Sequence, residues 1–190
     1  MTIMRMYNCI KWPIWVILLV CSAATNDQGE PFLCENGVVT IRSEATLELI
    51  QAKSNQLRGI IDPMKQTFVW KVNMSTLQGF NSPLQREHFN ESYLESDKYQ
   101  QAIFSGKIIE SVNFDKDGKI TVRAKGKLNI HGIEQERIIK STLDIKGNKI
   151  IVRASFTVPI SDHDIKIPKI VHQKIAEEIS VTINAQLEKQ

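Results

Sequence analysis

Hydrophobic and polar residues alternate along most of the chain, and most clearly in its second half. In ITVRAKGKLNIHG, residues 120–132, one parity is apolar or small and the other is polar, until the run ends at His131 and Gly132. The same period of two recurs in residues 67–74, 101–108, 150–160 and 179–188. A period of two places successive side chains on opposite faces, which is typical of half-buried strands. From Gly37 onward the chain is therefore predicted to be mainly β-structure.

Turn-forming residues separate the strand-like runs. The sequences Lys116-Asp117-Gly118-Lys119 and Lys146-Gly147-Asn148-Lys149 contain residues that tolerate the positive φ of tight hairpins, so consecutive strands are predicted to be antiparallel neighbours. Such strands pack as a two-sheet sandwich or close on themselves, and closure removes exposed strand edges. We predict an all-β fold, an extended antiparallel β-barrel of about eight strands.

Two segments interrupt the strand pattern with helical spacing. The first, residues 83–95, follows Ser82 and begins with Pro83 at a position suited to a first helical turn. The second begins at Pro168 and runs to about Glu178. One or two short peripheral helices are therefore expected, and Phe89 and Tyr93 of the first are candidates for closing one end of the barrel.

The N-terminal region has the pattern of a secretory signal peptide. Arg5 and Lys11 precede an apolar run, residues 14–20, which is followed by small residues up to Ala24. The apolar run is too short to span a bilayer. We interpret residues 1–24 as a signal peptide, 25–36 as a flexible lead and 37–190 as one barrel domain, in a periplasmic or secreted protein. Tethering as a lipoprotein through Cys21 is the less favoured alternative.

Charge and cysteine content narrow the functional classes. Cleavage after Ala24 would remove two basic and no acidic residues, so the formal net charge would fall from +3 to +1. A nearly neutral protein without a basic block gives no reason to expect nucleic-acid binding. Cys34 would be the only remaining cysteine, so no internal disulfide is expected. We interpret it as a small buried residue and not as a reactive thiol.

Small residues in the middle of several strands leave the barrel interior open to two interpretations. Ala124, Gly126, Ala154 and Ala185 lie on the apolar parity between larger residues. They either leave a narrow apolar passage or give space to neighbouring aromatic side chains such as Trp70 and Phe104. An eight-stranded barrel is wide enough for either arrangement.

Several segments resemble the YceI-like family of secreted lipid-binding proteins. They are YQQAIFSGKI (99–108), GKLNIHGI (126–133) and FTVPISDHDIKIP (156–168), and PLQREHFNESYLES (83–96) is similar to a longer branch of the family seen in Bacteroidetes-type bacteria. The resemblance implies a lipocalin-like barrel around a hydrophobic tunnel that holds a polyisoprenoid or isoprenoid-quinone chain. Gln100 and Glu134 depart from the family pattern, in connections between strands.

Few residues are candidates for catalysis or metal binding. His131, at the corner between two strands, is interpreted as structural, because no nucleophile with an orienting carboxylate is recognisable near it. Glu87, Glu91 and Glu95 are interpreted as a solvated acidic face, and the aspartates of Asp162-His163-Asp164 as turn residues that accept from backbone amides. We expect no catalytic residue, no metal site and no cofactor.

The leading hypothesis is a non-enzymatic carrier or store for a long apolar chain, a polyisoprenoid or an isoprenoid quinone. The predicted ligand-binding residues are Trp70, Phe104, Ile120, Val122, Leu128, Ile130, Val152, Phe156, Val181 and Ile183. Candidate partners are this lipid, a membrane contacted transiently during lipid exchange, and a second copy in a homodimer. The alternative is a barrel with a filled core and no lipid ligand, which binds a partner in the cell envelope through its outer surface.

Overall fold

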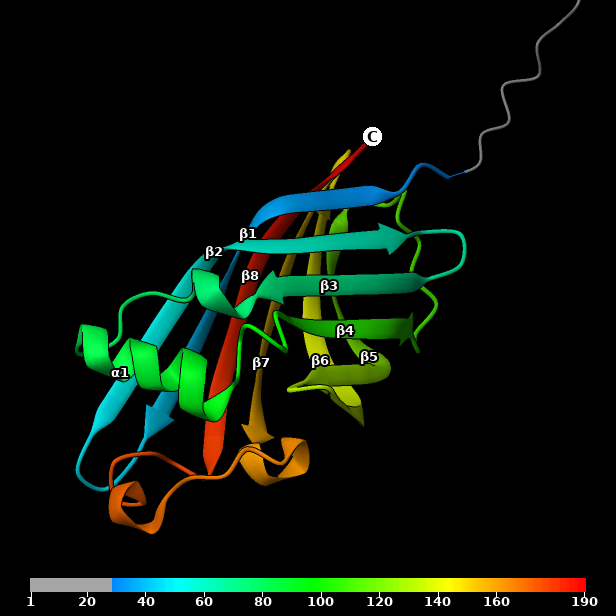
Figure 1. The fold of residues 1–190 in the computed structure, drawn as a ribbon. Coiled ribbons are helices and arrows are strands. Elements are labelled where there is room, and N and C mark those ends of the chain that lie inside the picture. The colour runs from blue at the N-terminus through cyan, green and yellow to red at the C-terminus, as the bar shows by residue number, and fades with distance from the viewer. Residues whose placement is uncertain (1–28) are drawn as a thin grey trace, which may run out of the picture.

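The computed structural model describes residues 29–190, and its eight strands form a closed antiparallel barrel (Figure 1). The strands are β1 Phe32–Glu44, β2 Leu49–Asp62, β3 Thr67–Asn73, β4 Gln101–Ile108, β5 Gly118–Ile130, β6 Ile133–Lys146, β7 Lys149–Pro159 and β8 Glu178–Lys189. Each strand pairs with the next one in sequence, and β8 pairs with β1 to close the barrel. The predicted all-β barrel of about eight strands is confirmed. The predicted signal peptide lies outside the described residues.

The strand parities follow the sequence pattern. In β5, Val122, Ala124 and Leu128 are buried, whereas Thr121 and Arg123 on the opposite parity are exposed. The same inward and outward alternation holds in β3, β7 and β8. The apolar side chains lie on the inward face of each strand, because burial in the barrel interior removes them from water.

The first strand of the barrel starts nearer the N-terminus than the sequence indicates. Strand β1 begins at Phe32, so residues 32–36 belong to the barrel and not to the flexible lead. Phe32 and Cys34 are both buried, and the Phe32 ring lies 5.9 Å from that of Phe114 between centroids. The tight hairpin predicted around Gly118 is replaced by a longer connection, residues 109–117, which leads into β5.

One of the two expected helices is present. Helix α1 spans Pro83–His88 and continues into a π-helical turn, η2 Phe89–Tyr93. The Ser82 hydroxyl accepts a hydrogen bond from the Gln85 amide at 3.1 Å, as the N-cap of α1. The remaining helical elements are short 3₁₀ turns, η1 Met74–Thr76, η3 Ile160–His163 and η4 Lys169–Val171.

The prediction of a second helix, from Pro168 to Glu178, is wrong. Only the single turn η4 and a few local bonds around Val171 form there, and the backbone beyond them bonds to other parts of the barrel. The Gln173 carbonyl accepts from the Leu47 amide at 2.8 Å, and the Ala176 amide donates to the Ser43 hydroxyl at 2.8 Å.

The two ends of the barrel differ. One end carries the β1–β2 turn, the helical β3–β4 connection, the β5–β6 turn and the long β7–β8 connection, residues 160–177 (Figure 1). We call it the mouth end. The other end carries the connection 109–117 and the turns at 63–66 and 147–148. We call it the closed end.

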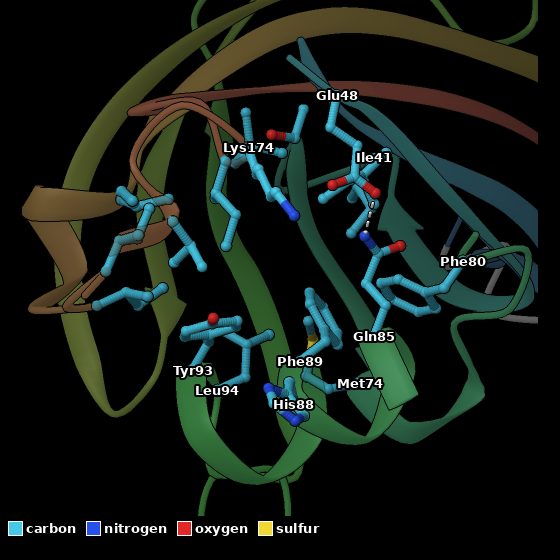
Figure 2. A pocket seen from close by; sticks show the side chains of 18 of the residues that line it. Ile41, Glu48, Met74, Phe80, Gln85, His88, Phe89, Tyr93, Leu94 and Lys174 are labelled. Carbon is cyan, nitrogen blue, oxygen red and sulfur yellow. Dashed lines mark hydrogen bonds between the residues drawn. The ribbon is translucent and has the colours of Figure 1, made fainter. Parts of the chain in front are cut away.

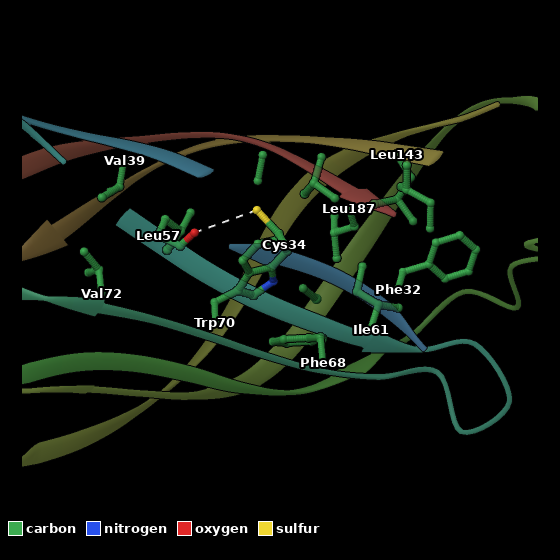
Figure 3. Close-up of a cluster of buried hydrophobic side chains, with 14 of the residues drawn as sticks. Phe32, Cys34, Val39, Leu57, Ile61, Phe68, Trp70, Val72, Leu143 and Leu187 are labelled. Carbon is green, nitrogen blue, oxygen red and sulfur yellow. Dashed lines mark hydrogen bonds between the residues drawn. The ribbon is translucent and has the colours of Figure 1, made fainter. Parts of the chain in front are cut away.

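Side chains fill the closed end and the middle of the barrel (Figure 3). The buried residues there include Phe32, Cys34, Ile61, Phe68, Trp70, Phe114, Val122, Leu143, Ile150 and Leu187. A side chain at Gly59 would overlap the Trp70 ring, and one at Gly106 would overlap the backbone of β5 at Lys125 and Gly126. The small residues in this region therefore allow aromatic packing and close approach of strands, and they do not outline an open passage.

Candidate functional site

A cavity of about 380 Å³ lies inside the mouth end of the barrel. Its apolar strand residues are Ile41, Ile50, Ile130, Val158, Ile179 and Val181. The β3–β4 connection adds Met74, Phe80, Leu84, Phe89, Tyr93 and Leu94, and the β7–β8 connection adds Ile160, Ile165, Ile167, Val171 and Ile175. The volume lies within the range of small-molecule sites, and the lining is mostly apolar, as is usual for such sites.

The helical segment forms one wall of this cavity. The rings of Phe80 and Phe89 pack with their centroids 4.8 Å apart, and Phe89 and Tyr93 both line the cavity (Figure 2). The Asn90 side chain donates to the Arg86 carbonyl at 3.0 Å and receives a hydrogen bond from the Ser96 hydroxyl at 3.2 Å. These local bonds hold the aromatic residues of the segment over the interior.

Polar groups gather at the rim of the cavity. The Glu48 carboxylate accepts from the side-chain amides of Gln85 and Asn81, at 2.9 and 3.0 Å (Figure 2). Lys174 reaches the cavity from the β7–β8 connection, and its amine lies on the cavity side of that connection in Figure 2. The cavity therefore combines an apolar interior with a polar entrance, which suits a ligand with an apolar tail.

The ten residues predicted to bind ligand all belong to the inward parity, but only two of them line this cavity. These two are Ile130 and Val181. Trp70, Val122, Leu128 and Val152 are buried side chains of the barrel interior. Phe104, Ile120, Phe156 and Ile183 are half-buried on the same inward face.

Most of the cavity lining was missed by sequence reasoning. Ile41 and Ile50 flank the β1–β2 turn, where the alternation is weaker and carries more polar residues. Ile165 and Ile167 lie in a connection without regular structure, although the alternation Ile165-Lys166-Ile167 is a signal for inward and outward placement. These residues can be assigned to the cavity only when it is known which end of the barrel is packed with side chains.

His131 joins three connections at the mouth end. It and Gly132 form the two-residue β5–β6 turn, with φ values of 52° and 75°, the combination that twisted hairpins favour. The His131 Nδ1 atom donates to the His163 carbonyl at 3.1 Å, and Nε2 lies 2.9 Å from the Glu95 carboxylate. The Tyr99 ring packs edge-on against the imidazole, with centroids 4.5 Å apart. Both ring nitrogens have structural partners, which agrees with a structural role.

His163, the last residue of η3 in the β7–β8 connection, is fully buried. Its Nδ1 atom donates to the Ile133 carbonyl at 3.1 Å, and its Nε2 atom has no hydrogen-bond partner within residues 29–190. Burial lowers the pKa of His163, because the charged imidazolium would lose its hydration. The neighbouring Asp162 carboxylate pairs with Arg137, which corrects its predicted role as an acceptor for turn amides.

Other candidate chemistry finds structural uses. Cys34 is buried, and burial raises the pKa of its thiol, as expected for a packed and unreactive side chain. No group of three or more His, Cys, Asp or Glu side chains within residues 29–190 is arranged to hold a metal ion. No helix in the described part of the chain is long and apolar enough to cross a membrane.

Comparison with known proteins places this barrel in a family. The YceI-like domain model matches residues 38–187. A polyisoprenoid binding domain from Saccharophagus degradans superposes with a TM-score of 0.72 at 12% identity, over 85% of this chain and 99% of that one.

Two further solved structures share the fold. BcnA from Burkholderia cenocepacia gives a TM-score of 0.65 at 13% identity, over 79% of this chain and 95% of that one. The YceI protein of Campylobacter jejuni gives 0.55 at 13% identity, over 71% and 81%. A search among curated proteins found no match. Because the family model spans most of the barrel, the chain belongs to the YceI-like domain family.

Proposed function

We propose that this protein binds a lipid with a long apolar chain, a polyisoprenoid or an isoprenoid quinone, and acts as its carrier or store. The observation that supports this proposal most directly is the apolar cavity at the mouth end of the barrel. Burial of hydrocarbon there supplies roughly 25 cal/mol for each Å² removed from water, so an extended apolar chain binds without any specific polar contact.

The filled closed end determines how such a lipid would lie. The closed end is packed with side chains, so the tail enters at the mouth and stops against the packed interior. The head group then remains at the rim, near Glu48, Gln85 and Lys174. A cavity of this size accommodates part of a long polyisoprenoid, and the remainder of the chain would lie outside the described cavity or require the interior to open.

Two related features are part of the proposal. The protein is not an enzyme, in keeping with the structural contacts of both nitrogens of His131. It is exported to the periplasm or secreted, as the basic and apolar pattern of residues 1–24 favours. A homodimer remains a prediction that sedimentation would test.

Native mass spectrometry of protein purified without detergent tests the proposal. We expect a bound mass of several hundred daltons that organic solvent removes, because a lipid trapped in an apolar cavity leaves slowly. A protein that carries no lipid after purification from its native cell envelope, and that takes up none from added polyprenols or quinones, would instead favour the filled barrel that acts through its surface.

A further inference from the structure

Large apolar side chains are exposed around the mouth of the barrel. Their exposed fractions are 65% for Leu47, 49% for Leu49, 59% for Leu84 and 90% for Ile170. They come from the β1–β2 hairpin, from α1 and from the β7–β8 connection. Single exposed apolar residues are common on protein surfaces, but a group from three segments around one opening indicates an interaction surface.

Hydrogen bonds join these three segments into one surface. The Leu47 amide donates to the Gln173 carbonyl at 2.8 Å, which ties the β1–β2 turn to the β7–β8 connection. The Asn81 side-chain amide donates to the Leu49 carbonyl at 3.0 Å, which ties the start of the helical segment to β2. We call the surface formed by Leu47, Leu49, Leu84 and Ile170 the mouth patch.

Basic residues accompany the mouth patch. The stretch IKIPKIVHQKI, residues 165–175, contains three lysines and no acidic residue. Lys166 lies 3.6 Å from the Asp164 carboxylate, whereas Lys169 and Lys174 have no ionic partner among the described residues. Within residues 165–175, apolar and basic side chains together match the interface of an anionic bilayer, in which hydrocarbon lies beneath negatively charged head groups. The exposed carboxylates of Glu87 and Glu91 lie on a different segment of the mouth end, the helical β3–β4 connection.

The mouth patch also surrounds the entrance to the cavity. Leu84 contributes to both the patch and the cavity lining, and Val171, adjacent to Ile170, lines the cavity. The opposite end of the barrel is packed with side chains. A surface at the mouth therefore faces the route that an apolar tail would take between the cavity and a membrane.

We propose that the mouth patch docks on the surface of an anionic phospholipid bilayer, with Leu47, Leu84 and Ile170 inserted among the acyl chains and Lys169 and Lys174 against the head groups. Docking in this orientation lets the lipid pass between bilayer and cavity without crossing water. This inference rests on the proposed lipid-binding function and specifies where the membrane contact is made.

Sedimentation with vesicles tests this surface. The wild-type protein should bind vesicles of phosphatidylglycerol and phosphatidylcholine more strongly than vesicles of phosphatidylcholine alone. The double variant Leu47→Ser, Ile170→Ser should lower the partition coefficient about tenfold, because two inserted apolar side chains are lost. Lys169→Gln, at an exposed position outside the cavity lining, should lower the preference for anionic vesicles and leave binding to neutral vesicles unchanged.

The chain offers a matched control for the apolar substitutions. Met64 and Ile138 are 72% and 59% exposed, but Met64 lies in the turn at the closed end and Ile138 lies in β6 outside the mouth patch. The double variant Met64→Ser, Ile138→Ser should bind vesicles as the wild type does. Equal loss in both double variants, or no binding of the wild type to anionic vesicles, would overturn the inference.

Two further readouts separate this inference from its alternatives. If the wild type carries lipid by native mass spectrometry but does not bind vesicles, the docking surface is rejected and the lipid-binding function stands. If sedimentation velocity finds a dimer that the Leu47→Ser, Ile170→Ser variant dissociates, and vesicles are not bound, the patch belongs to a contact between two copies. That result would also overturn docking on a membrane.

Discussion

At the scale of single residues, the histidines of the mouth end hold connections together. His131 contacts the His163 carbonyl and the Glu95 carboxylate, which come from two different connections. Both partners are hydrogen-bond acceptors, and together they fix the orientation of the ring. Gly132 must remain small as well, since a side chain there would contact the Tyr99 ring.

Replacing His131 with Ala should destabilise the protein and leave lipid binding largely intact. The variant loses two hydrogen bonds and leaves the His163 carbonyl without its partner, which costs about 1–3 kcal/mol. Urea denaturation measures this change in the free energy of unfolding. His172→Ala, at an exposed position whose side chain hydrogen-bonds to the Ile167 carbonyl, should have a smaller effect. A large loss of lipid affinity in a stably folded His131→Ala protein would contradict the structural role.

The buried His163 should make stability depend on pH. Its pKa is lowered by burial in the folded protein, whereas the unfolded chain binds a proton near the ordinary histidine pKa of about 6.5. Below that pH the unfolded state binds more protons, so stability falls as the pH decreases towards the lowered pKa. This contribution is fully present above about pH 7.

Comparison of wild type and His163→Asn between pH 7.5 and 5.5 isolates this contribution. The variant is expected to be less stable at pH 7.5, because Asn fills less of the buried site. Its free energy of unfolding should nevertheless fall less than that of the wild type as the pH decreases. Identical pH dependence of the free energy of unfolding in the two proteins would contradict this, because it would mean that the pKa of His163 is the same in the folded and unfolded states.

At the scale of elements, local sequence signals predicted α1 but not the β7–β8 connection. The N-cap Ser82 and the proline after it are local features, and they specify where α1 begins. The segment after Pro168 has helical spacing too, but its backbone bonds to Leu47 and Ser43 from distant parts of the chain. Such contacts depend on the closed barrel and leave no local signal.

Replacing Ser82 with Ala should loosen the helical wall of the cavity. The Gln85 amide loses its acceptor, and loss of an N-cap typically costs about 1 kcal/mol. Hydrogen exchange should therefore be faster at the amides of α1 and unchanged in β5 and β6. Ser82→Asp keeps a capping acceptor and should retain the protection of α1. Uniform loss of protection across the barrel would show that α1 does not open independently.

At the scale of the whole molecule, the sequence predicted the closed barrel but not where its interior is empty. The inward parity of β3, β5, β7 and β8 is visible as simple alternation. Which inward side chains meet depends on strand register and on packing between distant residues, such as Trp70 over Gly59. The cavity therefore lies nearer the mouth than most of the predicted ligand-binding residues.

The position of the cavity determines which substitution should block lipid binding. Bulk at Ala124, which is buried within the packed core, would strain the core itself. Val181 is half-buried in β8 and lines the cavity, so a larger side chain there can project into empty space. Thr182 is its exposed neighbour on the outer face and provides the matched control.

The most direct test of the central claim, that an apolar tail occupies the mouth-end cavity, compares Val181→Trp and Thr182→Trp with the wild type. Native mass spectrometry measures how much lipid co-purifies with each protein. If the tail lies in this cavity, Val181→Trp should carry at least about tenfold less lipid, because the added ring occupies the space of several methylene groups. Thr182→Trp should carry as much lipid as the wild type. Undiminished lipid in a folded Val181→Trp protein would contradict the account.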